Sequence, residues 1–141
     1  TNGGMLVRSA LALGAAGVWA GSGSADPCKA TALSRSAGAA FHLPIRTEPT
    51  ERFLAWVREA RVALVGADAE GVPAPRLPRT ERPLVLAVGN EGQGLSPQVR
   101  GACTALIAIP MAPSWDSLNA AVAGSVLLYA LSPLTRPKKA R

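Results

Sequence analysis

The sequence predicts an α/β fold in which a mostly parallel sheet is flanked by helices. Short aliphatic runs, such as Leu84 to Val88 and Leu106 to Ile109, alternate with longer amphipathic or small-residue segments. This alternation favours parallel strands joined by helical crossovers, and runs without polar residues are typical of strands covered on both faces. The 141 residues are 48% hydrophobic, which is enough for one domain with its own core.

In the first part of the chain, hydrophobic spacing and loop residues predict two helices and two strands. Residues 4–13 place Leu6, Ala10 and Leu13 near one helical face, and Gly14 suits the position after the last turn. The other elements expected here are a strand at 17–20, a helix at 29–36 and a strand at 41–45.

In the middle of the chain, Thr50 is expected to cap a helix over 51–61. The apolar stripe of that helix should face the sheet and belong to the core; it consists of Phe53, Leu54, Trp56 and Val57. A strand at 62–66 follows. Residues 68–83 contain four prolines and several charges, so we expect a surface connection there.

Towards the C-terminus, Ser96 and Pro97 suit the cap and first position of a short helix that ends near Ala102. The last helix is expected over 117–131, with a face of small residues that permits close backbone approach, and Pro133 should end it. Residues 133–141 are rich in Lys and Arg and are expected to form a disordered tail.

A glycine-rich loop, residues 89–94, follows the strand at 84–88. Its three glycines permit positive φ angles and let backbone N–H groups approach a ligand. The strand at 106–109 leads in the same way into a polar loop and then into residues 117–119. Because the carboxyl ends of parallel strands share one edge of a sheet, the two loops are candidates for the walls of one pocket. No Lys-Ser or Lys-Thr pair follows Gly94 and the loop has no GxGxxG pattern, which weakens the nucleotide triphosphatase and dinucleotide interpretations.

Three ordered motifs in these segments resemble those of one family. VGNEGQGL, IPM and SLN with the small-residue helix that follows are similar to motifs two and three of the SpoU/TrmH branch of the SPOUT RNA methyltransferases. Asn2, Gly3, Gly4 and Arg8 are similar to motif one. The resemblance implies a SPOUT-type fold with a C-terminal trefoil knot, S-adenosylmethionine as cofactor, a homodimer, and methylation of a ribose 2'-hydroxyl in tRNA or rRNA.

The resemblance also implies which residues form the site. The cofactor would be held by Gly89, Asn90, Glu91, Gly92, Gly94, Leu95, Ile109, Met111, Ser117 and Leu118. The reaction would depend on Asn2, Arg8, Glu91, Ser117 and Asn119.

Arg8 is expected to position the substrate phosphate or to stabilise the developing alkoxide, because a guanidinium stays protonated. Literal general-base chemistry by Arg8 is the second choice. Glu91 is expected to pair with Arg8. The structural alternatives are that Glu91 stabilises its loop and that Asn119 caps the last helix.

The charge balance suits a polyanionic partner, with Lys and Arg numbering 15 against 9 Asp and Glu, a net charge of +6. RNA is the expected partner, although a basic protein without nucleic-acid function has the same balance. The arginines at 76, 79 and 82 either contact RNA or belong to a solvated loop.

The remaining composition limits other classes of function. Cys28, Cys103 and the single His42 fit no metal-ligand spacing, so no metal is expected. Two lone thiols indicate a reducing compartment and a cytoplasmic protein. A single disulfide between the two cysteines stays open as an alternative. No stretch reaches the roughly 18 uninterrupted apolar residues of a membrane span.

Residues 1–132 are therefore expected to form a catalytic domain that lacks the family's first strand and any N-terminal RNA-binding domain. Two alternatives stay open. One is a non-catalytic RNA-binding or assembly protein that keeps the knotted fold. The other is a small-molecule-binding α/β protein of another kind.

Overall fold

The computed structural model describes residues 2–78 and 80–135. The helices are α1 (Asn2–Ala12), α2 (Ala30–Arg35), α3 (Thr50–Glu59), α4 (Pro97–Ala102) and α5 (Ala120–Leu131). The strands are β1 (Val18–Ala20), β2 (Ile45–Thr47), β3 (Ala63–Pro73), β4 (Leu84–Ala87) and β5 (Ala105–Ala108). Three short 3-10 helices are η1 (Ala39–Phe41), η2 (Ala74–Arg76) and η3 (Pro133–Thr135).

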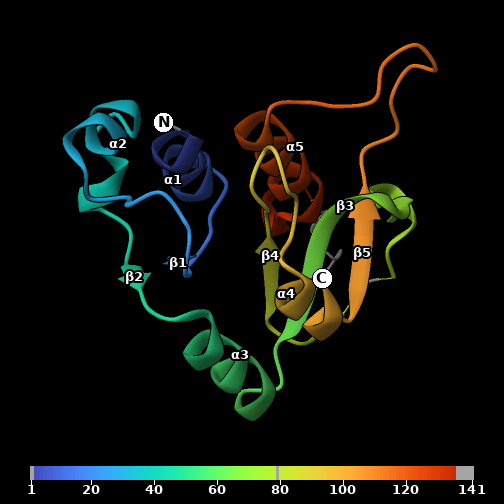
Figure 1. Ribbon diagram of the computed structural model, residues 1–141, viewed down its shortest axis with the longest axis horizontal. Helices are drawn as coiled ribbons and strands as arrows, with labels where there is room; N and C mark the ends of the chain where they lie inside the picture. Colours follow the sequence, from blue (N-terminus) through green and yellow to red (C-terminus); the bar gives the residue numbers. More distant parts are fainter. Residues whose placement is uncertain (1, 79, 136–141) are drawn as a thin grey trace, which may run out of the picture.

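The strands form two parallel sheets, which confirms the predicted α/β class. One sheet pairs β1 with β2, and the other has the order β4-β3-β5. In Figure 1, α1 and α5 lie side by side between the two sheets, while α2 covers the outer side of α1. The first and last helices of the chain therefore connect the two halves of the fold.

The core lies mainly around β3, which is the central strand of the larger sheet. Leu64 and, on β5, Ile107 have no exposed surface. Leu64 packs with Phe53, Leu54 and other residues of α3, as the apolar stripe predicts. Trp56 of that stripe is 41% exposed and is not a core residue.

Small residues set the distance between α1 and its neighbours. A methyl group added at Gly124 of α5 would lie 2.5 Å from Cδ2 of Leu6, which is closer than carbon atoms can pack. The hydroxyls of Ser9 and Ser125 are hydrogen-bonded across 2.6 Å. The small-residue face predicted for the last helix thus allows close packing, and in this chain it packs against α1.

Two elements in the first half differ from the prediction. The predicted strand at 41–45 is wrong: Phe41 ends η1 and is 77% exposed, and the strand is β2, which starts at Ile45. Pairing with β1, a contact distant in sequence, sets the start of this strand.

Thr50 is also not a cap. It is the first residue of α3, and its hydroxyl oxygen accepts a hydrogen bond from the N–H of Ser22 across 3.1 Å.

Two further boundaries differ in the second half. The segment 68–83 is not all connection, because β3 continues to Pro73 and pairs again with β5 after a register shift between Ala67 and Val72. β4 is packed on both faces, as predicted: Val85 and Ala87 lie against the cluster of α3, and Leu84 and Leu86 lie against the cluster of Ile107 and Leu127. Its residues are only half-buried, because it is an edge strand. The last helix starts at Ala120 and not at 117. Most of the predicted basic tail, residues 136–141, lies outside the described residues.

Candidate functional site

The glycine-rich loop closes on itself directly after β4. Asn90 N–H donates to the Gly94 carbonyl across 3.0 Å, and Gly94 N–H donates to the Asn90 carbonyl across 2.7 Å. A methyl group at Gly89 would lie 2.1 Å from the Gly94 carbonyl carbon, and Gly94 has a φ of 66°. Glycine is therefore needed at 89 for close approach and at 94 for the left-handed backbone.

Asn119 joins this loop to the first and last helices. Its side-chain oxygen accepts hydrogen bonds from the N–H groups of Ala121 and Val122, at 2.9 and 3.2 Å. Its Nδ2 donates to Oδ1 of Asn2 across 3.1 Å and also contacts Oε1 of Glu91. The predicted cap is therefore confirmed, and the same amide holds together three segments distant in sequence.

Glu91 interacts with the start of α5 as well. Its Oε1 accepts a hydrogen bond from the N–H of Ala120 across 3.4 Å. A carboxylate at this position favours the helix because the N-terminus carries partial positive charge. The predicted role of Glu91 in stabilising its loop is thus supported by these contacts, and the carboxylate is exposed to solvent.

The second predicted wall follows β5. Ile109 is half-buried and packs on the cluster that contains Ile107 and Leu127. Met111 and Leu118 are 37% and 41% exposed, and Ser117 is exposed too. The segment between Pro110 and Asn119 extends from the upper end of β5 before it returns to α5 (Figure 1). Because β4 and β5 run parallel within one sheet, this segment and the glycine loop leave the same sheet edge.

Arg8 does not lie in the Asn2–Glu91–Asn119 cluster. It lies six positions after Asn2 on α1, and this offset rotates the two side chains by about 240° around the helix axis. The predicted Arg8–Glu91 pair is wrong, because the ion pairs between described residues involve only Arg46 and Arg100 as cations.

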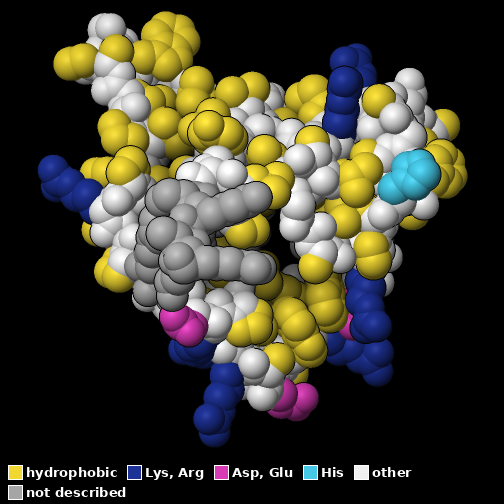
Figure 2. Space-filling model, turned by 180° about the vertical axis from the view of Figure 1, so that it is seen from behind, with side chains coloured by type: hydrophobic (Ala, Val, Ile, Leu, Met, Phe, Trp, Pro, Cys, Tyr) yellow, Lys and Arg dark blue, Asp and Glu magenta, His cyan; other side chains and the backbone are white. Residues whose placement is uncertain are grey.

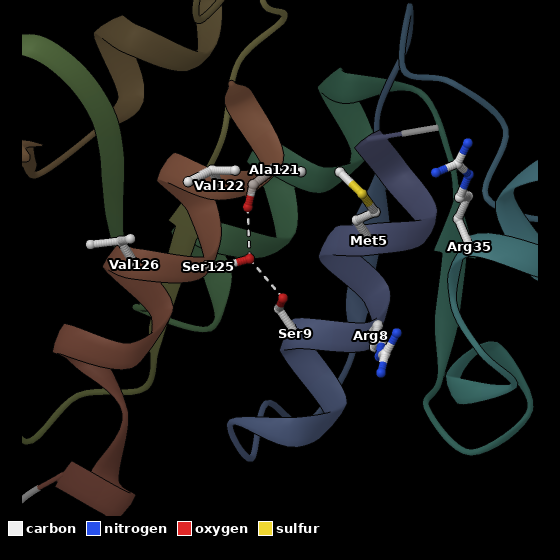
Figure 3. Close-up of a pocket in the computed structure, with 8 residues that line it drawn as sticks. All are labelled: Met5, Arg8, Ser9, Arg35, Ala121, Val122, Ser125 and Val126. Carbon is white, nitrogen blue, oxygen red and sulfur yellow. Dashed lines mark hydrogen bonds between the residues drawn. The ribbon is translucent and has the colours of Figure 1, made fainter. Parts of the chain in front are cut away.

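Arg8 lines a groove of about 450 Å³ instead. Figure 3 shows the groove along α1, with α5 on one side and Arg35 at the end of α2 on the other. The lining residues are Met5, Arg8, Ser9, Arg35, Ala121, Val122, Ser125 and Val126.

Arg100 is a structural residue that no motif in the sequence indicates. Its guanidinium donates to Asp68 and to Glu70, each across 2.9 Å. The hydrogen bond from Arg100 lowers the pKa of the Asp68 carboxyl below its ordinary value. These contacts fix α4, which follows the glycine loop, to β3. Arg100 and its two carboxylate partners are about 30 positions apart, so no local sequence spacing predicts these contacts.

Two negative findings apply to the described ranges. Within residues 2–78 and 80–135, no group of three or more His, Cys, Asp and Glu side chains could hold a metal ion. None of the helices in the same part of the chain is long and apolar enough to cross a membrane.

Comparisons with known proteins agree with the fold and with the motifs. The profile of the SpoU rRNA Methylase family matches residues 1–129. An uncharacterized tRNA/rRNA methyltransferase from Mycolicibacterium vanbaalenii is 40% identical over 127 residues, which cover 89% of this chain and 40% of the relative. One from Mycobacterium bovis is 38% identical over 141 residues, covering 98% and 44%.

Solved structures give the same result. The AdoMet-bound rRNA methyltransferase from Sinorhizobium meliloti matches with a TM-score of 0.89 and 32% identity, over 96% of this chain and 52% of that one. The SpoU methyltransferase AviRb from Streptomyces viridochromogenes, in complex with AdoMet, matches with a TM-score of 0.86 and 36% identity, over 92% and 51%.

The parallel sheet, the closed glycine loop and the cluster around Asn119 thus occur in a chain that matches methyltransferases over most of its length. The chain belongs to the SpoU rRNA methylase family. It spans about 40% of the length of the curated relatives it matches.

Proposed function

We propose that this chain binds S-adenosylmethionine and takes part in methylation of a ribose 2'-hydroxyl in rRNA or tRNA. The observation that carries the proposal is the glycine loop, closed between Asn90 and Gly94 and joined to α5 through Glu91 and Asn119. Two similar structures contain AdoMet. A third, described as an RNA 2'-O ribose methyltransferase, matches with a TM-score of 0.81 and 30% identity.

The donor-binding residues fit a cofactor that is held mainly by backbone. The close approach of Gly89 to Gly94 leaves no room for a side chain on that side of the loop. Backbone N–H and C=O groups at Gly89, Leu95, Ile109 and Leu118 would hold the adenosine and methionine portions, with Asn90, Gly92 and Ser117 beside them. The exposed side chains of Met111 and Leu118 offer apolar cover. When bound, S-adenosylmethionine supplies an electrophilic methyl group.

The polar residues of the chain have the task of orienting the acceptor. Methyl transfer requires the hydroxyl oxygen in line with the methyl group at near-attack distance. The amides of Asn2 and Asn119 are held in place by their mutual hydrogen bond and suit contacts with ribose. Arg8 remains a cation, so it orients a phosphate or stabilises the developing alkoxide, while the proton leaves to phosphate or water.

A homodimer is part of the proposal. Apolar side chains on α1 and α5 are exposed, namely Leu11 at 36%, Val122 at 46%, Val126 at 43% and Tyr129 at 63%. Association of two copies through these helices would remove this surface from water. Arg8 lies in the groove between the same helices, so a second copy would bring another site close to it.

Two other parts of the proposal concern the chain path and the substrate. We propose a C-terminal trefoil knot in which the segment after β5 passes the glycine loop. The contact between Asn119 and Glu91 supports this passage. RNA as substrate is supported by the net charge of +6 and by basic side chains standing out from the largely apolar and neutral surface in Figure 2.

The test combines donor binding with the chemistry of the product. Purified protein is titrated calorimetrically with S-adenosylhomocysteine and then incubated with tritiated S-adenosylmethionine and total rRNA or tRNA. We expect saturable binding and label in alkali-resistant dinucleotides, because alkaline cleavage of RNA requires a free 2'-hydroxyl. Arg8→Ala should retain binding and lose labelling.

The same test identifies the alternatives. Label recovered in mononucleotides after alkaline hydrolysis would show that the methyl group is on a base and not on the ribose 2'-oxygen. A folded protein that binds RNA but not S-adenosylhomocysteine would establish the non-catalytic RNA-binding alternative, which the separation of Arg8 from Glu91 also favours.

A further inference from the structure

We propose that Arg35 is a substrate-binding residue and forms, together with Arg8, a clamp of two guanidiniums for one phosphate of the RNA. The inference rests on the proposed function, because it takes RNA as the ligand. It adds a second cationic side chain to the one that the sequence motifs single out.

Packing between α1 and α2 places the two side chains together. A methyl group at Gly4 would lie 2.2 Å from the Ala32 carbonyl oxygen and 2.9 Å from Cβ of Arg35. The Cβ of Arg35, the base of its side chain, therefore lies directly against α1 at Gly4. Arg8 is one helical turn further along α1, and residues four apart lie on the same helical face.

Arg8 and Arg35 reach the same groove from two different helices (Figure 3). Both line the cavity of about 450 Å³, and both lie on the side of α1 towards α2, whereas Ser9 and Ser125 meet on the side towards α5. Both arginines are exposed. An anion that enters the groove thus meets two cationic groups from different helices.

No acidic side chain lines this groove. Elsewhere in the described residues, Arg46 and Arg100 are paired with carboxylates and Arg82 donates to a backbone carbonyl. The described hydrogen bonds and ion pairs of residues 2–78 and 80–135 include none from Arg8 or Arg35. Two neighbouring cations without a counter-charge repel each other, and a bound anion relieves that repulsion.

A phosphodiester is the anion that best fits this arrangement. Guanidinium groups bind phosphate through two parallel N–H donors, and a phosphate between the two helices can take one such pair from each side. The other lining residues of the groove carry no charge, so they offer no site for a second phosphate. The clamp would bind the phosphate backbone of the RNA and would not distinguish one base sequence from another.

The test measures the affinity of the purified protein for a short fluorescein-labelled single-stranded RNA by anisotropy, in KCl from about 50 to 200 mM. The variants are Arg35→Gln, Arg8→Gln and the double variant. Arg52→Gln is the matched control, because Arg52 is an exposed arginine on α3 outside the groove. Calorimetry with S-adenosylhomocysteine is run on each protein.

We expect Arg35→Gln to weaken RNA binding roughly tenfold at the lowest salt and to reduce the slope of log Kd against log[KCl] by at most about 0.7, the value for one phosphate contact, because Arg8 still contacts that phosphate. Arg52→Gln should change neither quantity by as much. The double variant should lose less than the product of the two single losses, because both guanidiniums hold one phosphate. Binding of S-adenosylhomocysteine should be the same in all four variants.

Two results would overturn the clamp: an Arg35→Gln protein that behaves like Arg52→Gln, or a wild-type protein that binds no RNA. If the loss of RNA affinity in the double variant equals the product of the two single losses, the two arginines do not share one phosphate. Failure of the proposed function looks different, because then the wild-type protein does not bind S-adenosylhomocysteine while the effect of Arg35→Gln on RNA persists.

Discussion

The side-chain amide of Asn119 donates a hydrogen bond to Oδ1 of Asn2 across 3.1 Å, although the two residues are 117 positions apart. The same amide contacts Glu91 of the glycine loop. A position read as a helix cap therefore also unites the start of the first helix, the start of the last helix and the loop between them.

Substitutions at Asn119 separate these two roles. Asn119→Ser keeps an oxygen that can cap α5 but removes the amide that meets Asn2 and Glu91, and Asn119→Ala removes both. We expect the alanine variant to lose about 1 kcal/mol of unfolding free energy and the serine variant much less. Both should lose most methyl transfer. Full activity of Asn119→Ser, measured by tritium incorporation beside thermal unfolding, would reduce Asn119 to a cap.

The glycine loop offers a matched pair of substitutions. At Gly89 a methyl group meets backbone atoms of Gly94 and Leu95 at 2.1 to 2.4 Å, whereas at Gly92 the nearest atom is Oδ1 of Asn90 at 3.7 Å. Gly89→Ala should open the loop and lower the affinity for S-adenosylhomocysteine at least tenfold, about 1.4 kcal/mol. Gly92→Ala should bind nearly as the wild type does. Calorimetric titration checks both, and equal affinities would exclude backbone closure at Gly89 as a requirement.

The two thiols should differ in reactivity. Burial raises the pKa of the Cys103 thiol, which donates a hydrogen bond to the Val99 carbonyl across 3.2 Å, whereas Cys28 is exposed. The thiolate is the reactive form, so iodoacetamide near pH 8 should label Cys28 first and Cys103 several times more slowly. Peptide mass spectrometry over time measures both rates. Faster labelling of Cys103 would show that α4 opens readily from β3.

Acid should weaken the attachment of α4 to β3. The hydrogen bond from Arg100 lowers the pKa of Asp68 in the folded protein, so this contribution is fully present above the unfolded pKa of about 3.9 and is lost as the pH falls through the lower folded value. The stability difference between wild type and Arg100→Gln should be small, shrink below about pH 4 and decrease with salt, because the pair is near the surface. Urea titrations at several pH values measure it; a difference that persists at pH 2 would assign it to packing.

Features determined by neighbouring residues could be predicted from the sequence. Ser96 accepts the expected hydrogen bond from Val99 N–H and Pro97 starts α4, since a cap depends on residues within one turn. The parallel strands followed from aliphatic runs, and the glycine loop closes where its three glycines indicated a turn. These patterns also carried the family resemblance.

Features determined by distant partners could not be predicted. Thr50 looks like a cap until Ser22 supplies a donor for its hydroxyl. Arg8 was expected beside Glu91, but it lies on another face of α1, and the Glu91 carboxylate contacts the side-chain amide of Asn119 instead. The continuation of β3 to Pro73 depends on pairing with β5, across a segment whose prolines and charges indicate a surface connection.

The packing of α1 against α5 also has a consequence for synthesis of the chain. The helix that packs on α1 through Ser125 and Gly124 is made more than a hundred residues after α1 itself. Val7 and Ala10 of α1 can pack earlier, against Ala39 and Leu43, but until α5 is made the side of α1 that faces it has no native cover, and contacts between such distant segments form slowly. The contact between α1 and α5 can therefore form only late in synthesis of this domain, after both sheets have been made.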